Sequence, residues 1–268
     1  MLSNTVIRAK KGVKPNKPIL IVGLPGIGGV GKLVAEHLKR EFHAKRFATL
    51  YSPHFPHHVA MTRSGRIRLA GNRFYLIKRK PQDIVILTGD TQAVSPEGQY
   101  EVNSKIVDFF KDRLGGSLIY TIGGYNIGES ILNEKPKVFG NATNKRMIES
   151  MKNTDVIFGK SKGLIWGSAG LIIAFAKLRK MDAVCIMGET SLLEVDAGSA
   201  KAVIVQLSKI LDLDVKTGDL DKIITKTAKA IAELERQGAP LQGQQQFHIG
   251  GGEESPGASS SHRPSYIR

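Results

Sequence analysis

The chain has 268 residues, a length that fits one large or two small domains. Of these residues 41% are hydrophobic and 24% are charged, which is the composition of an ordinary soluble protein. Its 39 Lys and Arg outnumber its 24 Asp and Glu, which gives a net charge of +15 at pH 7. The sequence has no run of eighteen apolar residues and no apolar segment of signal-peptide type near its start, so we expect a cytoplasmic protein without a membrane partner.

Short apolar runs alternate with segments of helical periodicity, which predicts a sheet with helices packed on its faces. Strands are expected at 18–23, 47–51, 73–78, 83–88, 117–122, 155–158, 163–166 and 183–187. Helices are expected at 30–42, 96–114, 143–152, 168–180, 198–211 and 219–236. The helix at 96–114 has a clear start, because Ser95 is a good N-cap and Pro96 suits the first helical position.

The segment after Gly238 differs from the rest of the chain in composition. It consists mainly of Gly, Ser, Gln and Pro and has few apolar residues, so it cannot bury enough surface to offset its ordering entropy. We therefore expect one α/β domain at 1–237 and a disordered tail at 238–268. The tail ends in Tyr266, Ile267 and Arg268, an apolar end beside a free carboxylate, which a partner could capture; a chance ending is the alternative.

The stretch "PILIVGLPGIGGVGKLVAEHL" at 18–38 contains two overlapping nucleotide motifs. A phosphate-binding loop is matched by Gly26, Gly31 and Lys32, and a dinucleotide motif by Gly26, Gly28 and Gly31. Each motif is incomplete. Leu33 stands where a phosphate loop needs Ser or Thr for Mg²⁺, and "AKRFATLYS" at 44–52 lacks the acid that would hold a ribose.

Two interpretations of this loop remain open. Pro25 removes a backbone donor, and glycines at a strand-to-helix turn also allow close packing, through a positive φ or a close helix approach at Gly26 and Gly28. In this structural interpretation the loop binds no cofactor. The alternative is a nucleotide-dependent enzyme that uses the glycine-rich loop at 26–32.

Other catalytic or metal-binding signatures are weak. The histidines of "HFPHH" at 54–58 have neither helical spacing nor cysteine partners, and Ser168 lacks the flanking pattern of a nucleophile elbow. Asp90 follows an apolar run, as a metal-binding acid in a nucleotide enzyme does. Cys185 lies in an apolar run, which favours a buried structural thiol. We therefore expect neither catalytic residues nor a metal site.

The net positive charge is concentrated in the first third of the chain. Residues 1–80 hold 17 Lys and Arg against Glu36 and Glu41 alone, whereas residues 81–268 hold 22 of each sign. This asymmetry indicates either an acidic partner or a solubility feature. The segment "TRSGRIRLAGNR" at 62–73 predicts a hairpin that turns Arg66 and Arg68 to solvent and packs Ile67 and Leu69 inward. Motifs for specific nucleic-acid recognition are absent from the sequence.

Four segments together resemble the proteasome assembly chaperone family, in its archaeal branch. They are "GLPGIGGVGKLVAEHL" at 23–38, "GGY" at 123–125, "GLIWGSAGLIIAFAKLRKMDAVCIMGET" at 163–190 and "DAGSAKAVIVQLSKILDLDVKTGDL" at 196–220. The resemblance covers residues 15–237. It implies a three-layer α/β/α domain with a mixed, mostly parallel sheet of nucleoside-phosphorylase type, without enzymatic activity, that forms homo-oligomers.

The resemblance also implies roles for two sets of residues. The first turn of the family's fold corresponds to Gly23, Pro25, Gly26, Gly28 and Gly31. Family members insert a tail ending in hydrophobic-Tyr-any between proteasome α subunits, and the matching positions here are Tyr266, Ile267 and Arg268. This chain departs from that pattern, since Ile267 stands at the Tyr position. The alternative within the family is an ATP-grasp-like enzyme, which would need acidic Mg²⁺ ligands.

Overall fold

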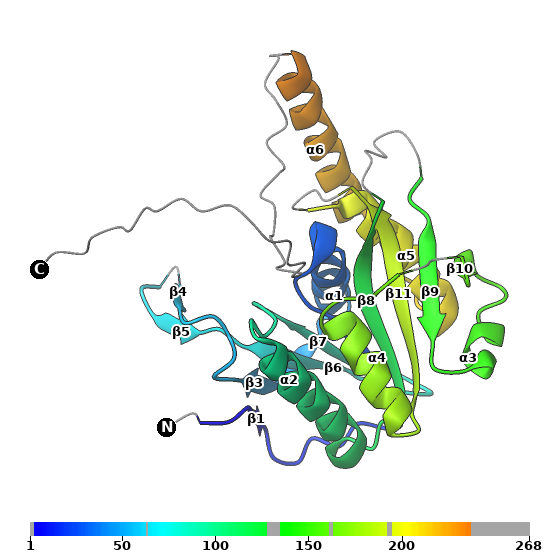
Figure 1. Ribbon diagram of the computed structural model, residues 1–268. Helices are drawn as coiled ribbons and strands as arrows, with labels where there is room; N and C mark the ends of the chain where they lie inside the picture. Colours follow the sequence, from blue (N-terminus) through cyan, green and yellow to red (C-terminus); the bar gives the residue numbers. More distant parts are fainter. Residues whose placement is uncertain (1–2, 63, 128–134, 161–162, 192–194, 237–268) are drawn as a thin grey trace, which may run out of the picture.

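The computed structural model describes residues 3–62, 64–127, 135–160, 163–191 and 195–236. A nine-stranded sheet runs through the molecule, and two short strands form a hairpin beside it (Figure 1). The strands are β1 (Val6–Ala9), β2 (Ile19–Gly23), β3 (Lys45–Tyr51), β4 (Val59–Met61), β5 (Ile67–Leu69), β6 (Asn72–Ile77), β7 (Ile84–Gly89), β8 (Leu118–Asn126), β9 (Val138–Ala142), β10 (Val156–Phe158) and β11 (Asp182–Thr190). The helices are α1 (Val30–Glu41), α2 (Pro96–Asp108), α3 (Lys145–Glu149), α4 (Ser168–Leu178), α5 (Ala197–Leu211) and α6 (Gly218–Arg236).

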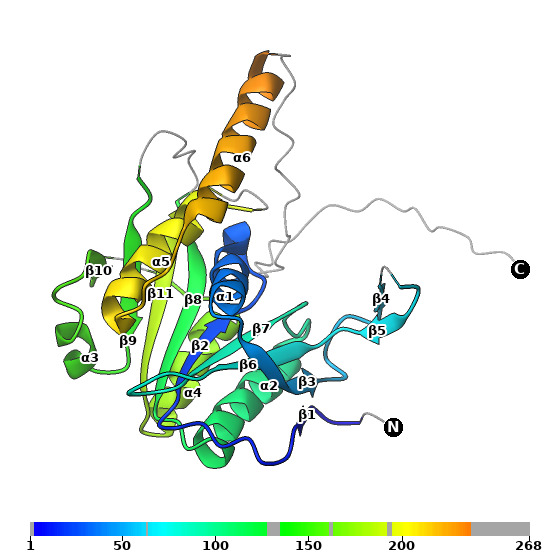
Figure 2. The same ribbon diagram turned by 180° about the vertical axis from the view of Figure 1, so that it is seen from behind.

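The large sheet is mixed, in the order β1-β3-β6-β7-β2-β8-β11-β9-β10. Its centre, β7-β2-β8-β11, is parallel, while β6 and β9 flank that centre in the antiparallel direction. Helices α1 and α5 cover one face and α2 and α4 cover the other, as the two opposite views show (Figures 1 and 2). The predicted three-layer α/β/α fold is confirmed.

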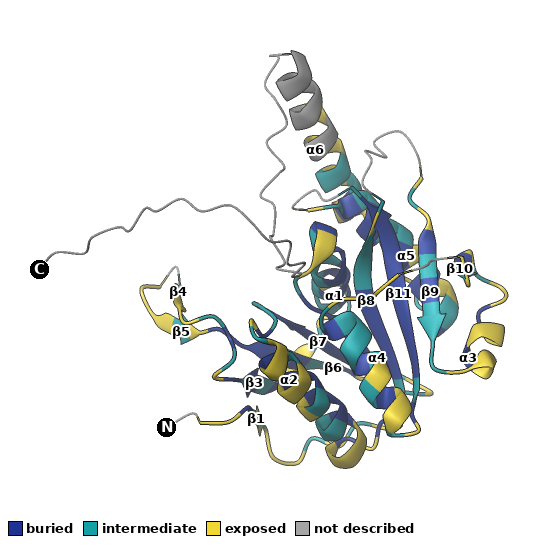
Figure 3. Ribbon diagram, viewed as in Figure 1, coloured by how far each residue is buried: buried dark blue, intermediate teal, exposed yellow. Residues whose placement is uncertain are grey.

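The central strands form because apolar side chains occupy both of their faces. In β2, Ile19 and Ile21 belong to the core under α1 and α5, whereas Leu20 and Val22 belong to the core under α2 and α4. A strand that is buried on both sides reads as a continuous apolar run, which explains why the sequence predicted it well. Strands β2 and β7 are accordingly buried along their whole length, and β11 along all but its first residue (Figure 3).

The helix after β7 begins as predicted and ends earlier. Ser95 caps it by accepting a hydrogen bond from the N–H of Gly98 at 3.1 Å, and Pro96 is its first residue. Helix α2 ends at Asp108, and a π-helical turn at Phe109–Arg113 follows.

Other predictions need correction. Residues 163–166 do not form a strand, and sequence reasoning missed β1 and β9. The predicted hairpin at 62–73 exists as β4 and β5, but Ile67 and Leu69 do not pack inward: both are exposed. The predicted tail at 238–268, with Tyr266, Ile267 and Arg268, lies outside the described residues. Within the described parts of the chain, no helix combines the length and the apolar character that a membrane crossing needs.

Candidate functional site

The strongest candidate site lies at the carboxyl end of the four parallel strands, where open α/β sheets usually bind ligands. The turn between β2 and α1, the loop after β7 and the start of α4 meet there. Gln92 joins all three, because its Nε2 donates to the carbonyl oxygen of Pro25 at 2.6 Å and its Oε1 accepts from the N–H of Ser168 at 2.8 Å. Sequence reasoning missed Gln92, which has no motif around it.

Internal hydrogen bonds close the glycine turn. The N–H of Gly29 donates to the carbonyl oxygen of Gly26 at 2.9 Å, and the N–H of Asp196 donates to the carbonyl oxygen of Gly28 at 2.8 Å. Gly28 and Gly29 both have φ of 60°, the left-handed region that favours glycine. The turn thus uses its own polar groups to link the start of α1 to the loop after β11.

Two glycines of this turn allow helix α1 to touch the sheet directly. A Cβ on Gly23 would lie 2.0 Å from the carbonyl oxygen of Gly31, and a Cβ on Gly31 would lie 2.4 Å from the carbonyl oxygen of Ile122. Both positions exclude any larger residue unless the backbone moves. The close packing of α1 on β2 and β8 therefore depends on them.

Gly28 and Gly26 differ from each other. A Cβ on Gly28 would lie 2.6 Å from Oγ1 of the buried Thr190. At Gly26, φ is −172°, and the nearest atom to a Cβ would be 3.7 Å away, in Gln92. The expectation of a positive φ or a close approach is therefore wrong for Gly26.

The carboxylates near the glycine turn already have protein partners. Asp90 accepts from Arg73 at 2.8 Å, from Arg68, and from the N–H of Gly71 at 3.1 Å. Because two guanidinium groups occupy it, this side chain is not arranged as a metal ligand.

Two further acids at this end of the sheet have structural roles. Glu189 accepts from the N–H of Lys137 at 3.0 Å, and Asp196 caps α5 by accepting from the N–H of Ser199 at 2.8 Å. In the part of the chain that the structure describes, no group of three or more His, Cys, Asp and Glu is placed to hold a metal ion.

The remaining chemically interesting side chains are also engaged or buried. Cys185 is fully buried, and its burial raises the pKa of the thiol to about 11, so the thiolate is scarce at neutral pH. Nε2 of His54 lies 3.0 Å from Oε2 of Glu101, within hydrogen-bond distance. Both observations fit structural roles.

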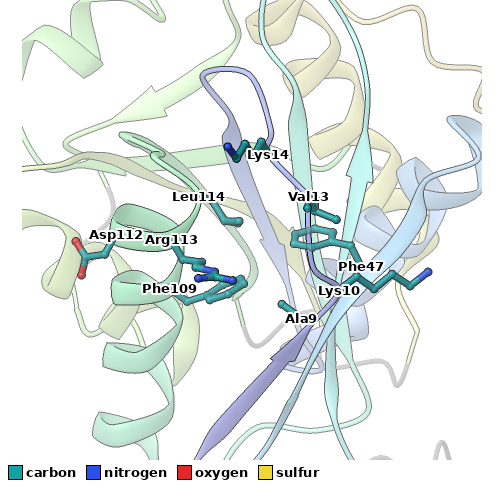
Figure 4. A pocket seen from close by; sticks show the side chains of 10 residues that line it. Ala9, Lys10, Val13, Lys14, Phe47, Phe109, Asp112, Arg113 and Leu114 are labelled. Atoms are coloured by element: carbon teal, nitrogen blue, oxygen red, sulfur yellow. The ribbon is translucent and has the colours of Figure 1, made fainter.

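A pocket of about 290 Å³ lies at the opposite, amino end of the sheet (Figure 4). It lies between the segment after β1, strand β3 and the end of α2, and its apolar walls include Phe47, Phe109 and Leu114. Asp112 points away from the other lining side chains (Figure 4). The volume is just below the range of roughly 300–1,000 Å³ that is usual for ligand sites, and Asp112, the only acid among the lining residues, does not face the basic ones.

The carboxyl end also exposes large apolar side chains. Trp166 is 65% exposed in the loop before α4, and Leu164 of the same loop is exposed too. Val94, in the loop after β7, and Ile27, in the turn after β2, are exposed at the same end of the sheet. Exposed apolar residues grouped on one end of a molecule are typical of a protein-protein contact. This end of the sheet therefore offers an interaction surface more than a reaction centre.

Comparisons with known proteins agree with this architecture. The model of the PAC2 family matches residues 20–235. PbaB of Pyrococcus furiosus, an archaeal proteasome activator, is 37% identical, with a TM-score of 0.81, over 87% of this chain and 99% of its own. PbaA of the same organism, an archaeal homologue of proteasome-assembly chaperone, is 22% identical, with a TM-score of 0.74, over 88% and 93% of the chains. An uncharacterized protein of Methanocaldococcus jannaschii is 37% identical over 81% of this chain and 83% of its own length.

Proposed function

The chain belongs to the PAC2 family, among the archaeal homologues of proteasome-assembly chaperones, and from this premise we propose that it binds the α-ring of the proteasome. In this proposal the protein is a non-enzymatic, cytoplasmic, homo-oligomeric assembly chaperone. Its tail, residues 238–268, docks on the ring through Tyr266, Ile267 and Arg268.

One observation carries the proposal: the 37% identity to PbaB extends over 99% of a protein that is itself a proteasome activator. The carboxyl end of the sheet supports a binding role. Its acids already have structural partners: Asp90 pairs with arginines, Glu189 accepts from a backbone N–H, and Asp196 caps helix α5. Its large apolar side chains are exposed. We accordingly propose that Gly23, Pro25, Gly26, Gly28 and Gly31 form a structural turn and do not bind phosphate.

The decisive experiment measures binding to purified α-rings by biolayer interferometry. Full-length protein is compared with a version truncated after Gly238. The expected result is binding by the full-length chain and a loss of about tenfold or more in affinity on truncation, since a buried apolar end with a carboxylate governs dissociation. Equal binding by both proteins would rule out the tail mechanism, and binding by neither would rule out the partner.

A second function, activation of the mature proteasome, is favoured by the same relative. PbaB is an activator, and it matches this chain at higher identity than PbaA does. The two functions differ in what the protein does to complete particles. Faster hydrolysis of a fluorogenic peptide by the mature proteasome would favour activation, whereas faster formation of α-rings from free subunits would favour the chaperone.

The enzymatic alternative predicts ATP binding at the loop 26–32. We expect none, because Leu33 replaces the hydroxyl that would hold Mg²⁺ and the turn closes on itself. Titration calorimetry with ATP, with and without Mg²⁺, tests this. Micromolar binding that disappears in Lys32→Ala would overturn the non-enzymatic assignment.

A further inference from the structure

The hairpin formed by β4 and β5, residues 59–69, is hereafter called the projecting hairpin. It extends from the ends of β3 and β6 and stands away from the nine-stranded sheet (Figures 1 and 2). Its strands pair Val59 with Leu69, Ala60 with Arg68, and Met61 with Ile67. Because side chains alternate along a strand, the first and third pairs lie on one face and the middle pair lies on the other.

The face with four apolar side chains is open to solvent. Met61 is 88% exposed and Ile67 is 74% exposed, and Val59 and Leu69 are exposed beside them. Together they present on the order of several hundred Å² of contiguous apolar surface, the size at which a patch usually marks an interaction site. The described part of the chain offers this face no covering element.

The opposite face fixes the hairpin to the body of the protein. Arg68 donates to Asp90, directly after β7, with its two terminal nitrogens Nη1 and Nη2, and Arg73 of β6 binds the same carboxylate. The N–H of Gly71 also donates to Asp90. A two-stranded hairpin is marginally stable by itself, so this cluster holds the apolar face in one orientation before any partner arrives.

Charge indicates which kind of partner fits the exposed face. Residues 59–73, the hairpin and its return to the large sheet, contain four Arg and not one Asp or Glu, and Asp90 pairs with two of the four, Arg68 and Arg73. Arg66, in the hairpin, is exposed, and the described part of the chain gives it no acidic partner. The complement of this surface is therefore an apolar groove with carboxylates at its rim.

The same charges disfavour a symmetric contact between two projecting hairpins. A two-fold contact would pack each apolar face against its copy and add a second exposed Arg66, without adding an acid from 59–73 to pair with either. A partner with an apolar groove and acidic residues beside it would cover the apolar side chains and pair with the exposed arginine.

We propose that the projecting hairpin is a docking element, independent of the tail, that inserts Met61 and Ile67 into an apolar groove with an acidic rim on the proteasome α-ring. This inference rests on the proposed function for the identity of the partner. It adds a second contact, on the folded domain, to the one expected from the tail.

The test uses a double variant that carries both Met61→Ser and Ile67→Ser. This variant is compared with wild type in the full-length chain and in the chain truncated after Gly238. Both side chains are mostly exposed, so the double variant should keep its melting temperature. Leu178→Ser is the matched control, because Leu178 is 77% exposed at the far end of α4. Binding to purified α-rings is followed by interferometry.

We expect the double variant to lose about tenfold or more in affinity in both backgrounds, mainly through faster dissociation, and the Leu178→Ser control to stay within about twofold of wild type. If wild type binds and the double variant binds equally well, the hairpin proposal is wrong and the proposed function stands. If wild type does not bind, both are wrong.

Two further outcomes would overturn the proposal. A change in molar mass of the double variant in light scattering would make the hairpin an interface between copies of this chain. Hairpin-dependent sedimentation with vesicles of anionic phospholipid, with unchanged binding to α-rings, would make it a membrane contact.

Discussion

Gly26 and Gly28 are two residues apart in one turn, yet only Gly28 needs to be glycine. Gly28 has φ of 60°, and a Cβ on it would lie 2.6 Å from the buried Thr190, whereas Gly26 is extended with space around it. We expect Gly28→Ala to lower the free energy of unfolding by about 1–3 kcal/mol, from the left-handed backbone and the displaced threonine. Gly26→Ala should stay within about 0.5 kcal/mol of wild type.

Urea unfolding of both variants checks this prediction. Equal stability of the two variants would show that the geometry of the turn does not limit the fold. A structural role for Gly28 would then lose its support, and the ligand interpretation of the loop would regain it.

Asp83 shows how a buried carboxylate stabilises the fold through its hydrogen bonds. Its side chain is 3% exposed and accepts from the N–H of Asn16 at 2.7 Å, from Lys78 at 2.8 Å and from the N–H of Arg79 at 3.1 Å. Burial by itself would raise the pKa of Asp83, but these donors outweigh burial and hold the pKa below its ordinary value of 3.8. The ionised carboxylate therefore stabilises the native state at neutral pH.

We expect Asp83→Asn to lower the free energy of unfolding by about 1.5–3 kcal/mol at about pH 7, since an amide NH₂ would face other donors. A lowered pKa gives stability that is present above the unfolded value and is lost as the pH falls through the folded value. The difference between wild type and variant should therefore shrink below about pH 4. Urea unfolding across this pH range measures it, with the exposed Asp112→Asn as control; a difference that does not change with pH would contradict the assignment.

At the scale of elements, Arg68 and Arg66 have different roles in the projecting hairpin: one orders it, and the other is available to a partner. Arg68 holds the hairpin through Asp90, whereas Arg66 is exposed. The prediction that both face solvent is confirmed for Arg66 and holds only in part for Arg68, whose side chain is 38% exposed. We expect Arg68→Gln to increase hydrogen exchange of residues 59–69 several-fold and Arg66→Gln to leave that exchange unchanged.

Mass-spectrometric hydrogen exchange on the free protein tests this pair. Protection of the central strands serves as the internal reference, because both variants should leave it unchanged. Equal exchange in the two variants would show that the contact with Asp90 does not order the hairpin.

The elements that sequence predicted best are those whose pattern reflects burial. Strands β2, β7 and β11 are apolar on both faces, and the helices after β7 and β11 are capped by Ser95 and Asp196. The segment 163–166 has the same apolar composition as a strand but forms an exposed loop, because Trp166 and Leu164 point into solvent.

The candidate site was predictable only in part. The glycine pattern located the turn, but its closure depends on Gln92, Thr190 and Asp196, which come from distant segments. The hairpin face was misjudged for a related reason. Alternation places Ile67 and Leu69 on one face, but only the tertiary arrangement decides whether that face meets a core or solvent.

At the scale of the whole molecule, the uneven charge predicts a salt-dependent association rate. The +15 of residues 1–80 should steer an acidic partner over a Debye length of about 8–10 Å. We expect the association rate with α-rings to fall steeply between low and physiological salt, while the dissociation rate changes little.

Two charge-reversal variants test whether the basic first third of the chain is responsible for this salt-dependent association. Arg66→Glu, in the basic third, should slow association several-fold, and Arg113→Glu, an exposed residue in the neutral remainder, should not. Stopped-flow or interferometric rates measure both. Rates that ignore salt and both substitutions would leave the excess charge as a solubility feature.

The place of the projecting hairpin in the chain has an evolutionary consequence. The chain leaves the large sheet after β3 and returns to it at β6, where Leu50 pairs with Asn72, so the ends of the excursion are held together by the sheet itself. Lengthening such a closed excursion costs little, about 0.6 kcal/mol for each doubling. Insertions, deletions and exchanges between Val59 and Leu69, which lie outside both hydrophobic cores, can therefore accumulate without disturbing the fold, and a lineage can acquire a new binding preference by replacing this segment alone.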